Sequence, residues 1–263
     1  MNGADPAAWW SGVDLADAVP DGPAAFCADL GPAGLLAGYR AGAFPMPAAD
    51  DYAMYLNEAR YEDLVAAGAV ALDDPLGDGS GYRVAWWSPD PRPVIAVGEA
   101  RLGSRLARRL RGRTNWTTTA DRAFDEVVRR CAEGRRPVWL TEELRRGLAA
   151  LHTAGRAHSA EVWEDGTLVG GVFGVRVGPV LSLDSMFRLR PDAARIAVVD
   201  LARRFAETGG RLLDAQWDGP HVRSLGATAM PRTRYLRLLH EGGDSRPPPG
   251  DERPVRLLGA ALL

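Results

Sequence analysis

Three short runs of apolar residues in the second half of the sequence most constrain how this chain can fold. The runs are 159–163, 168–175 and 180–187. The turn Glu164-Asp165-Gly166 separates the first two runs, and a turn at Gly178 separates the last two. Short strand-like runs joined by tight turns predict consecutive antiparallel strands, so we expect a β-meander over this region.

Helical patterns surround the meander. The segments with helical periodicity are 29–43, 55–67, 121–132, 142–153, 191–205 and 232–240. An apolar strand over 211–217 follows the helix that begins at Pro191. A meander, a helix and a strand behind N-terminal helices is the element order of Gcn5-related N-acetyltransferase (GNAT) acyltransferases. The sequence therefore predicts an α+β protein with a small N-terminal domain followed by a GNAT-like domain.

Charge is distributed unevenly along the chain. Residues 1–100 contain 4 Arg and 15 acidic residues, whereas 101–263 contain 28 Arg and 19 acidic residues. We expect a small acidic N-terminal domain over 1–100, the GNAT-like domain over 101–241 and a flexible tail rich in Pro and Gly over 242–263. The basic second part favours a nucleic acid or another polyanion as partner.

The most basic segment, 101–136, contains 11 Arg and four acidic residues. Its first arginines recur at helical spacing without interleaved acids, so we favour a phosphate-binding face over an ordinary solvated helix face. The candidate phosphate contacts are Arg101, Arg105, Arg108, Arg109, Arg111 and Arg113.

Several classes of chemistry are excluded by residues that the sequence lacks. All 32 basic residues are Arg, so a Walker A loop and a lysine Schiff base are both impossible. The four His show no zinc-ligand spacing, and no Gly-x-Ser-x-Gly motif is present. We expect no metal site and no cofactor.

Features of the whole chain favour a cytoplasmic protein. Cys27 and Cys131 are too few for a disulfide framework and fit a reducing compartment. The first residues lack the pattern of a signal peptide, and no apolar run is long enough to span a membrane.

A polar pair ends the strand expected over 211–217. Asp214 and Gln216 lie two residues apart, so their side chains share one face of that strand. They form either a satisfied polar pair or, with Asp184 on a neighbouring strand, a catalytic centre for acyl transfer to an amine. Coenzyme A is the usual acyl donor on this fold, but the expected pyrophosphate loop, 188–194, contains no glycine. A larger polyanionic acyl carrier is therefore favoured.

Nine short motifs occur in the order found in leucyl/phenylalanyl-tRNA-protein transferases. Because of these motifs, the chain resembles that family over about residues 30 to 240. The motifs are Trp86-Trp-Ser-Pro-Asp-Pro-Arg92, Trp139-Leu-Thr141, Leu151-His152 to Gly155, Ala157-His-Ser-Ala-Glu-Val-Trp163, Leu168-Val-Gly-Gly-Val-Phe-Gly174, Asp184-Ser-Met-Phe187, Gly209 to Gln216, Ser224-Leu-Gly-Ala227 and Pro231-Arg232.

The resemblance implies an enzyme that moves Leu or Phe, and less readily Met, from aminoacyl-tRNA to the N-terminal Arg or Lys of a protein and so marks it for degradation. It implies that Asp214 and Gln216 handle the attacking amine, with Asp184 at the position of a family glutamate. The substrate-binding residues that it implies are Trp87 and Trp139 for the terminal adenosine, and Val172, Met186, Leu201, Phe205 and Leu213 for the amino-acid side chain. The arginine face would meet the tRNA backbone, and we expect a monomer.

Three other functions fit parts of the sequence. The first is an aminoacyl-tRNA-dependent transferase with a small-molecule acceptor, and the second is a noncatalytic RNA-binding relative. The third is a coenzyme A acetyltransferase.

Overall fold

A computed structural model describes residues 5–112, 114–241 and 246–260 of the chain. The structure divides into two compact units, and neither is one continuous segment. Unit 1 comprises 1–92, 134–151 and 230–239, and unit 2 comprises 93–133, 152–229 and 240–263. This division differs from the contiguous domains that we expected, because the chain returns twice to unit 1 after residue 92. The architecture is nevertheless of the α+β class, with a small sheet in one unit and a larger mixed sheet in the other.

Unit 1 is built on a four-stranded sheet in the order β2-β4-β1-β3, in which β1 and β3 are parallel. Its strands are β1 (Pro23–Cys27), β2 (Phe44–Pro47), β3 (Ala71–Asp73) and β4 (Val84–Trp87). Its helices are α1 (Pro6–Ser11), α2 (Pro32–Ala41), α3 (Asp51–Ala66), η1 (Ser80–Arg83), most of α6 (Glu142–Thr153) and α9 (Arg232–Leu239). The helix expected over 29–43 is α2, and the amphipathic segment around 55–67 lies within α3.

The paired tryptophans of β4 have different environments. Trp86 is fully buried, donates from Nε1 to the Cys27 carbonyl at 2.9 Å, and packs edge-on against Trp10. Gly38 of α2 allows this packing, since a Cβ there would lie 2.3 Å from the Trp86 ring. Trp87 points to the opposite face of the strand and is half-buried. Trp86 therefore anchors unit 1, and Trp87 is left at its surface.

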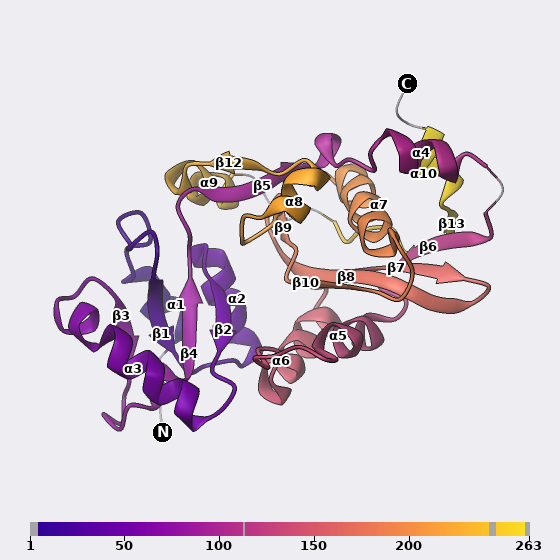
Figure 1. Cartoon of the computed structure of the whole chain (residues 1–263). Helices are drawn as coiled ribbons and strands as arrows, with labels where there is room; N and C mark the ends of the chain where they lie inside the picture. The colour runs from indigo at the N-terminus through magenta and orange to yellow at the C-terminus, as the bar shows by residue number, and fades with distance from the viewer. Residues whose placement is uncertain (1–4, 113, 242–245, 261–263) are drawn as a thin grey trace. The chain divides into compact units, whose positions relative to one another are not determined.

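Unit 2 contains most of a nine-stranded mixed sheet in the order β12-β5-β11-β9-β8-β7-β6-β13, with β10 also paired to β8 (Figure 1). Its strands are β5 (Arg92–Ala96), β6 (Trp116–Ala120), β7 (Ala157–Glu164), β8 (Thr167–Val177), β9 (Val180–Ser182), β10 (Ser185–Arg188), β11 (Leu212–Asp214), β12 (Thr228–Met230) and β13 (Arg253–Pro254). Its helices are η2 (Val97–Glu99), α4 (Ser104–Leu110), α5 (Phe124–Ala132), α7 (Ala193–Glu207), α8 (Pro220–Leu225) and α10 (Arg256–Ala260). The meander that the sequence predicts is confirmed in β7, β8 and β9.

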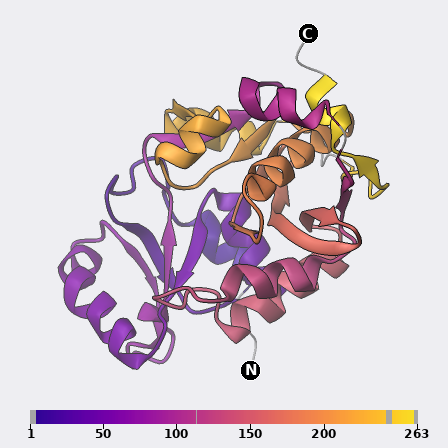
Figure 2. The same cartoon turned by 45° about the vertical axis from the view of Figure 1, so that its right-hand side comes forward.

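Two consecutive glycines of β8 allow helices to pack closely on both faces of the sheet. A Cβ on Gly170 would lie 2.5 Å from Ala193 of α7, and a Cβ on Gly171 would lie 2.9 Å from Val127 of α5. Neighbouring strand residues point to opposite faces, so α7 covers one face and α5 the other (Figures 1 and 2). The core of unit 2 lies between α7 and the sheet and includes Ile196, Leu201 and Phe205.

The strand expected over 180–187 is interrupted, and this expectation was wrong. The Ser182 hydroxyl bonds both to the amide of Val175, at 2.8 Å, and to its carbonyl, at 3.2 Å. Gly174 lies against the Ser182 carbonyl, where no side chain would fit. The chain therefore leaves the ladder after β9 and rejoins β8 as β10. Asp184 lies at this break, which frees its side chain from regular strand geometry.

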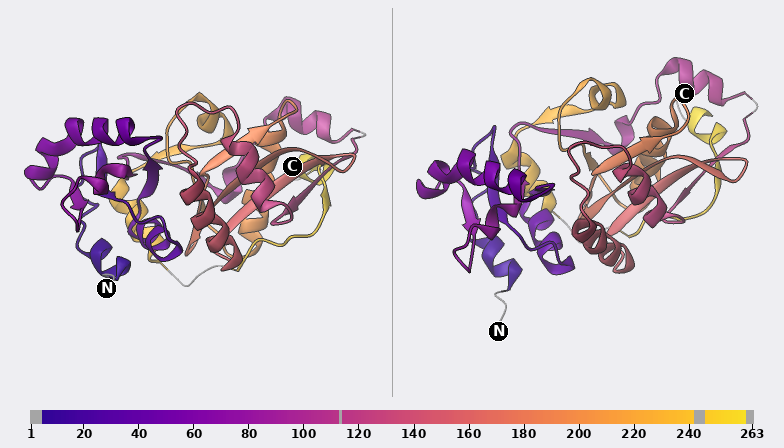
Figure 3. Two further views of the ribbon diagram at one scale, coloured as in Figure 1. Left: turned by 90° about the horizontal axis from the view of Figure 1, so that it is seen from below. Right: turned by 60° about the horizontal axis from the view of Figure 1, so that its bottom comes forward.

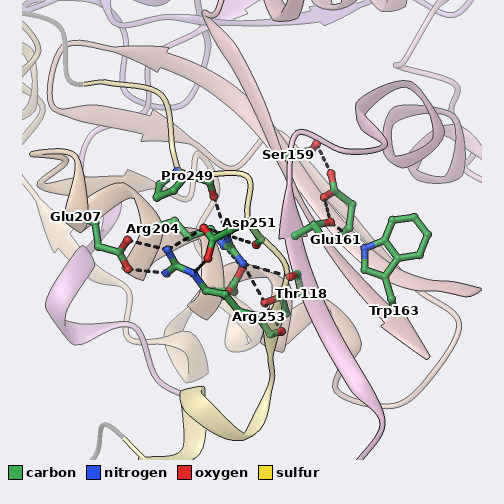
Figure 4. A network of polar contacts seen from close by, with 11 residues as sticks. Thr118, Ser159, Glu161, Trp163, Arg204, Glu207, Pro249, Asp251 and Arg253 are labelled. Carbon is green, nitrogen blue, oxygen red and sulfur yellow. Dashed lines mark hydrogen bonds and ion pairs between the residues drawn. The ribbon is translucent and has the colours of Figure 1, made fainter. Parts of the chain in front are cut away.

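The segment expected to form a flexible tail is ordered where the structure describes it. Residues 253–254 form β13 beside β6, and α10 packs near α4 and α7 (Figure 3). The fully buried Arg204 of α7 holds this segment, since its guanidinium donates to the carbonyls of Pro249 at 2.6 Å and Asp251 at 2.8 Å (Figure 4). A buried arginine, which the helical pattern alone does not reveal, therefore fixes the C-terminal segment.

A second polar cluster lies on β6 and β7 (Figure 4). The buried Glu161 accepts hydrogen bonds from the Ser159 and Thr119 hydroxyls, each at 2.5 Å. Burial raises the pKa of Glu161, and these hydroxyl donors oppose the rise. Nearby, the Nδ1 atom of the buried His158 lies 2.7 Å from Asp121. The carboxylates of this cluster are hydrogen-bonded, whereas the Nε2 atom of His158 is buried and has no hydrogen-bond partner among the described residues.

Candidate active site

The candidate site begins where β11 ends, at Asp214. This strand is apolar and fully buried up to Leu213, and Asp214 itself is 1% exposed. One carboxylate oxygen of Asp214 accepts a hydrogen bond from the Gln216 backbone N–H at 2.9 Å. That contact is an Asx-turn, in which an aspartate side chain replaces a backbone acceptor and reverses the chain.

Gln216 completes the turn and connects the two carboxylates. Its φ angle is 61°, in the left-handed region that residues other than glycine rarely adopt. Its Nε2 atom donates to Oδ1 of Asp184 at 2.5 Å. Asp184 is half-buried at the break between β9 and β10, while Gln216 is buried. The structure thus brings together Asp184, Asp214 and Gln216, as the sequence predicts, in one hydrogen-bonded chain.

The route by which Gln216 reaches this position differs from our expectation. We placed Asp214 and Gln216 on one face of a continuous strand over 211–217. In the structure β11 ends at Asp214, and the following residues form the turn. The two-residue spacing therefore predicted correctly that Asp214 and Gln216 belong to one site. They are brought together by a turn, however, and not by a shared face of one strand.

The residues that the resemblance assigns to the amino-acid side chain lie mostly in the core of unit 2. Four are fully buried there: Val172, Leu201, Phe205 and Leu213. Met186 is half-buried at the edge of this core and lines a surface cavity. Trp87 and Trp139, assigned to the terminal adenosine, are both half-buried residues of unit 1.

The arginines expected to bind phosphates are grouped on and beside α4. Leu102, Leu106 and Leu110 are buried, whereas Arg105 and Arg108 are exposed. Among the residues that the structure describes, these two arginines have no hydrogen-bond or ion-pair partner. Their charges are therefore available to a ligand.

The other four arginines of this set differ in their partners. Arg101 contacts Glu99 at 3.3 Å, Arg109 contacts Asp192 at 2.6 Å, and Arg111 donates to the Gly259 carbonyl at 3.3 Å. Arg113 lies outside the described residues.

Sequence reasoning missed a set of polar residues beside Met186. The His221 Nε2 atom lies 3.3 Å from the Met186 sulfur, and His221 shares a cavity of about 410 Å³ with Arg188 and Arg195. Burial lowers the pKa of His221, and the two arginines lower it further. The sequence signal for this cluster is the arginine-rich segment 188–195, which begins at the last residue of the strand that contains Met186. That segment entered our sequence prediction only through its lack of glycine.

The described residues, 5–112, 114–241 and 246–260, contain no group of three or more His, Cys, Asp or Glu side chains placed to hold a metal ion. Cys27 and Cys131 are both buried as free thiols. Burial raises the pKa of the Cys27 thiol to about 12, so it is not an activated nucleophile. Within the same described ranges, no helix has both the length and the apolar character needed to cross a membrane.

Two carboxylates and an amide joined at a strand end can handle the proton transfers of acyl transfer to an amine, and surface arginines suit a polyanionic acyl carrier, so the α+β fold and this site fit the acyltransferase class. Comparison with known proteins specifies the family. Residues 94–240 match the profile of the family described as Leucyl/phenylalanyl-tRNA protein transferase.

Many curated proteins similar to this chain bear the name leucyl/phenylalanyl-tRNA--protein transferase, and three of them show the extent of the similarity. The one from Xanthomonas axonopodis pv. citri is 34% identical and is aligned over 99% of this chain and 96% of its own length. The protein from Syntrophotalea carbinolica is 36% identical, over 92% of this chain and 94% of its own length. The protein from Chromohalobacter salexigens is 38% identical, over 84% of this chain and 75% of its own length. The chain therefore belongs to the leucyl/phenylalanyl-tRNA-protein transferase family.

Proposed function

We propose that this protein transfers Leu or Phe, and less readily Met, from aminoacyl-tRNA to the N-terminal Arg or Lys of a protein, which marks that protein for degradation by the N-end rule. The observation that carries the proposal is the hydrogen-bonded chain of Asp184, Gln216 and Asp214 in a member of this family. The reaction needs no ATP and no cofactor, because the ester of the aminoacyl-tRNA is already activated. We further propose that it acts as a monomer in the cytoplasm, where two buried free thiols remain reduced.

The three polar residues suit the proton transfers of this reaction. The attacking α-amine forms a C–N bond with the ester carbonyl carbon, and the bond from that carbon to the ribose oxygen breaks. The nitrogen loses one proton and the ribose oxygen gains one. Since Nε2 of Gln216 donates to Asp184, its Oε1 atom is available to accept from the amine. The carboxylate of Asp214 then favours departure of the proton.

We propose that unit 2 has a GNAT-like fold. Two features support this proposal: α7 lies between β10 and β11 in the chain, and β9 and β11 are parallel neighbours. The break at Asp184 also separates β9 from β10, although both strands pair with β8.

A transfer assay tests the proposed function. Purified protein is incubated with separately charged Leu-, Phe- and Met-tRNA and with a peptide that begins with Arg, and the mass of the peptide is followed. Addition of Leu or Phe to this peptide, and none to a control peptide that begins with Ala, is the expected result. Transfer to neither peptide while tRNA still binds would contradict the proposal.

The arginine face of α4 gives a separate prediction for tRNA binding. Replacing both Arg105 and Arg108 by Gln is expected to weaken tRNA binding, because each unpaired arginine can neutralise one phosphate. The slope of log K against log salt concentration should become shallower by about 2. A matched double variant, Arg129→Gln with Arg130→Gln on α5, should keep the original slope, and an unchanged slope in the α4 variant would refute the assignment.

A further inference from the structure

A cavity of about 410 Å³ lies at the junction of β10 and α7 in unit 2. Its walls combine apolar side chains of β10 with the arginines Arg188 of β10 and Arg195 of α7 and with an imidazole of α8. The lining residues are Met186, Phe187, Arg188, Asp192, Ala194, Arg195 and His221. No role has been assigned above to the cationic part of this wall.

The cavity carries an excess of positive charge. Arg188 is exposed and, in the part of the chain that the structure describes, has neither an ion-pair nor a hydrogen-bond partner. Arg195 uses its guanidinium to donate to the carbonyls of Ser224, at 2.8 Å, and Arg101, at 3.1 Å, which are neutral groups. The one acidic residue, Asp192, is neutralised by Arg109 of α4 at 2.6 Å. Two arginine charges therefore remain for a ligand.

The start of α7 adds to this potential. This helix of 15 residues begins at Ala193, and both Ala194 and Arg195 of its first turn line the cavity. The backbone N–H groups of a first helical turn have no acceptors within the helix, and the helix dipole favours an anion there. The N-terminus of α7 and the side chains of Arg188 and Arg195 therefore both favour a negatively charged ligand.

The cavity is also adjacent to the candidate catalytic residues. Its wall includes Met186, two residues after Asp184, and two residues of extended chain span about 7 Å. An anion bound here would therefore lie close to a group held by Asp184 and Gln216.

A second cavity lies toward α4, and each of its two arginines is paired with a carboxylate, Arg109 with Asp192 and Arg190 with Glu164. It has a volume of about 330 Å³ and is lined by Arg109, Leu110, Thr114, Trp116, Arg190 and Pro191. The pair between Arg109 and Asp192 links the two cavities, since each residue lines one of them. Arg105 and Arg108 continue from there along α4. A half-buried Trp beside arginines suits stacking of a base next to its phosphate.

We propose that the β10–α7 cavity binds phosphodiester groups in the single-stranded acceptor end of the aminoacyl-tRNA, and that the chain then continues past Trp116 to α4. This inference rests on the proposed function and adds the path of the donor. The other substrate, with its cationic N-terminal Arg or Lys, is repelled by Arg188 and Arg195. Sequence-independent contacts with phosphates fit a site that receives the same acceptor end from every tRNA.

The test compares two minimal donors that differ in one phosphate: phenylalanyl-adenosine and its 5′-phosphorylated form. The quantity measured is the ratio of kcat/KM for the phosphorylated donor to that for the unphosphorylated donor. We expect Arg188→Gln to lower this ratio at least about fivefold, because a charge-assisted contact is lost. Arg129→Gln, which removes an exposed arginine of α5, should leave the ratio at its original value.

A binding measurement keeps the inference testable even if no transfer occurs. The trinucleotide CCA is titrated into the full-length protein and into Arg188→Gln at low and high salt. We expect at least about fivefold weaker binding by the variant at low salt and a smaller difference at high salt. Equal binding of CCA by both proteins would overturn the inference. Absence of transfer by the original protein, with CCA binding still dependent on Arg188, would instead refute the proposed reaction.

Discussion

Replacing Asp214 by Asn is expected to lower kcat at least about tenfold while affinity for aminoacyl-tRNA changes less than about twofold. Asparagine retains an Oδ1 acceptor for the Gln216 N–H, so the Asx-turn at the end of β11 persists. The substitution removes the negative charge that favours departure of the amine proton. Single-turnover transfer, measured at saturating aminoacyl-tRNA, isolates this step from donor binding.

The matched control for this substitution is Glu126→Gln, another exchange of a carboxylate for an amide. Glu126 forms exposed ion pairs with Arg129 and Arg130 on α5 and takes no part in the hydrogen-bonded chain of Asp184, Gln216 and Asp214. Its variant should transfer at the original rate. Equal losses of turnover and of tRNA affinity in Asp214→Asn would show that Asp214 maintains the fold, and a reduced melting temperature would lead to the same conclusion.

Periodicity predicted the longer helices and the meander of unit 2, but none of the four strands of unit 1. The helix predicted over 142–153 is α6, and the Thr141 hydroxyl caps it by accepting from the Leu144 N–H at 3.3 Å. The preceding helix, α5, buries all four apolar residues that we expected to face inward: Phe124, Val127, Val128 and Cys131. Burial of one face is a local property of the sequence, so a pattern of a few residues reveals it.

The geometry of the candidate site depended on contacts that no local pattern contains. Asp184 and Gln216 are 32 residues apart in sequence, and their contact requires both a break in one strand and a turn after another. The break depends on the Ser182 hydroxyl taking the place of a backbone partner, and the turn depends on a positive φ at Gln216. The apolar pattern continues through both places, and it therefore predicted uninterrupted strands.

The C-terminal segment illustrates the same limit. Its Pro- and Gly-rich composition favours flexibility, and composition carries no information about a partner elsewhere in the chain. The partner is Arg204, which lies 45 residues before Pro249 and accounts for the order of the segment. Within α7 this arginine occupies a buried position, where helical periodicity predicts an apolar side chain.

Replacing Arg204 by Met is expected to destabilise unit 2 by about 3–5 kcal/mol, the usual cost of leaving a buried charge without its partner. The side chains of Arg204 and Asp200 are 0% and 1% exposed, and they form an ion pair at 2.6 Å. A loss of this size lowers the melting temperature of a domain of this size by roughly 6 to 20 °C. Thermal unfolding followed by circular dichroism measures the shift.

The control for this loss is Arg211→Gln, which breaks an exposed ion pair with Glu241. Such pairs contribute at most about 1 kcal/mol, so its melting temperature should change little. In the double variant Asp200→Leu with Arg204→Met, no buried charge is left unpaired, and most of the lost stability should return. Similar losses of melting temperature in Arg204→Met and Arg211→Gln would contradict the special role of Arg204.

The pH dependence of the Arg204→Met variant identifies the cause of its instability. Burial raises the pKa of Asp200, and Arg204 opposes this rise, so the variant should raise that pKa further. A folded-state pKa above the unfolded value favours the folded state at low pH, and this contribution is lost as pH rises through the folded pKa. The melting temperature of the variant should therefore fall further below the original at pH 8 than at pH 5. A pH-independent difference would mean that the lost hydrogen bonds to Pro249 and Asp251, rather than the charge of Asp200, account for the destabilisation.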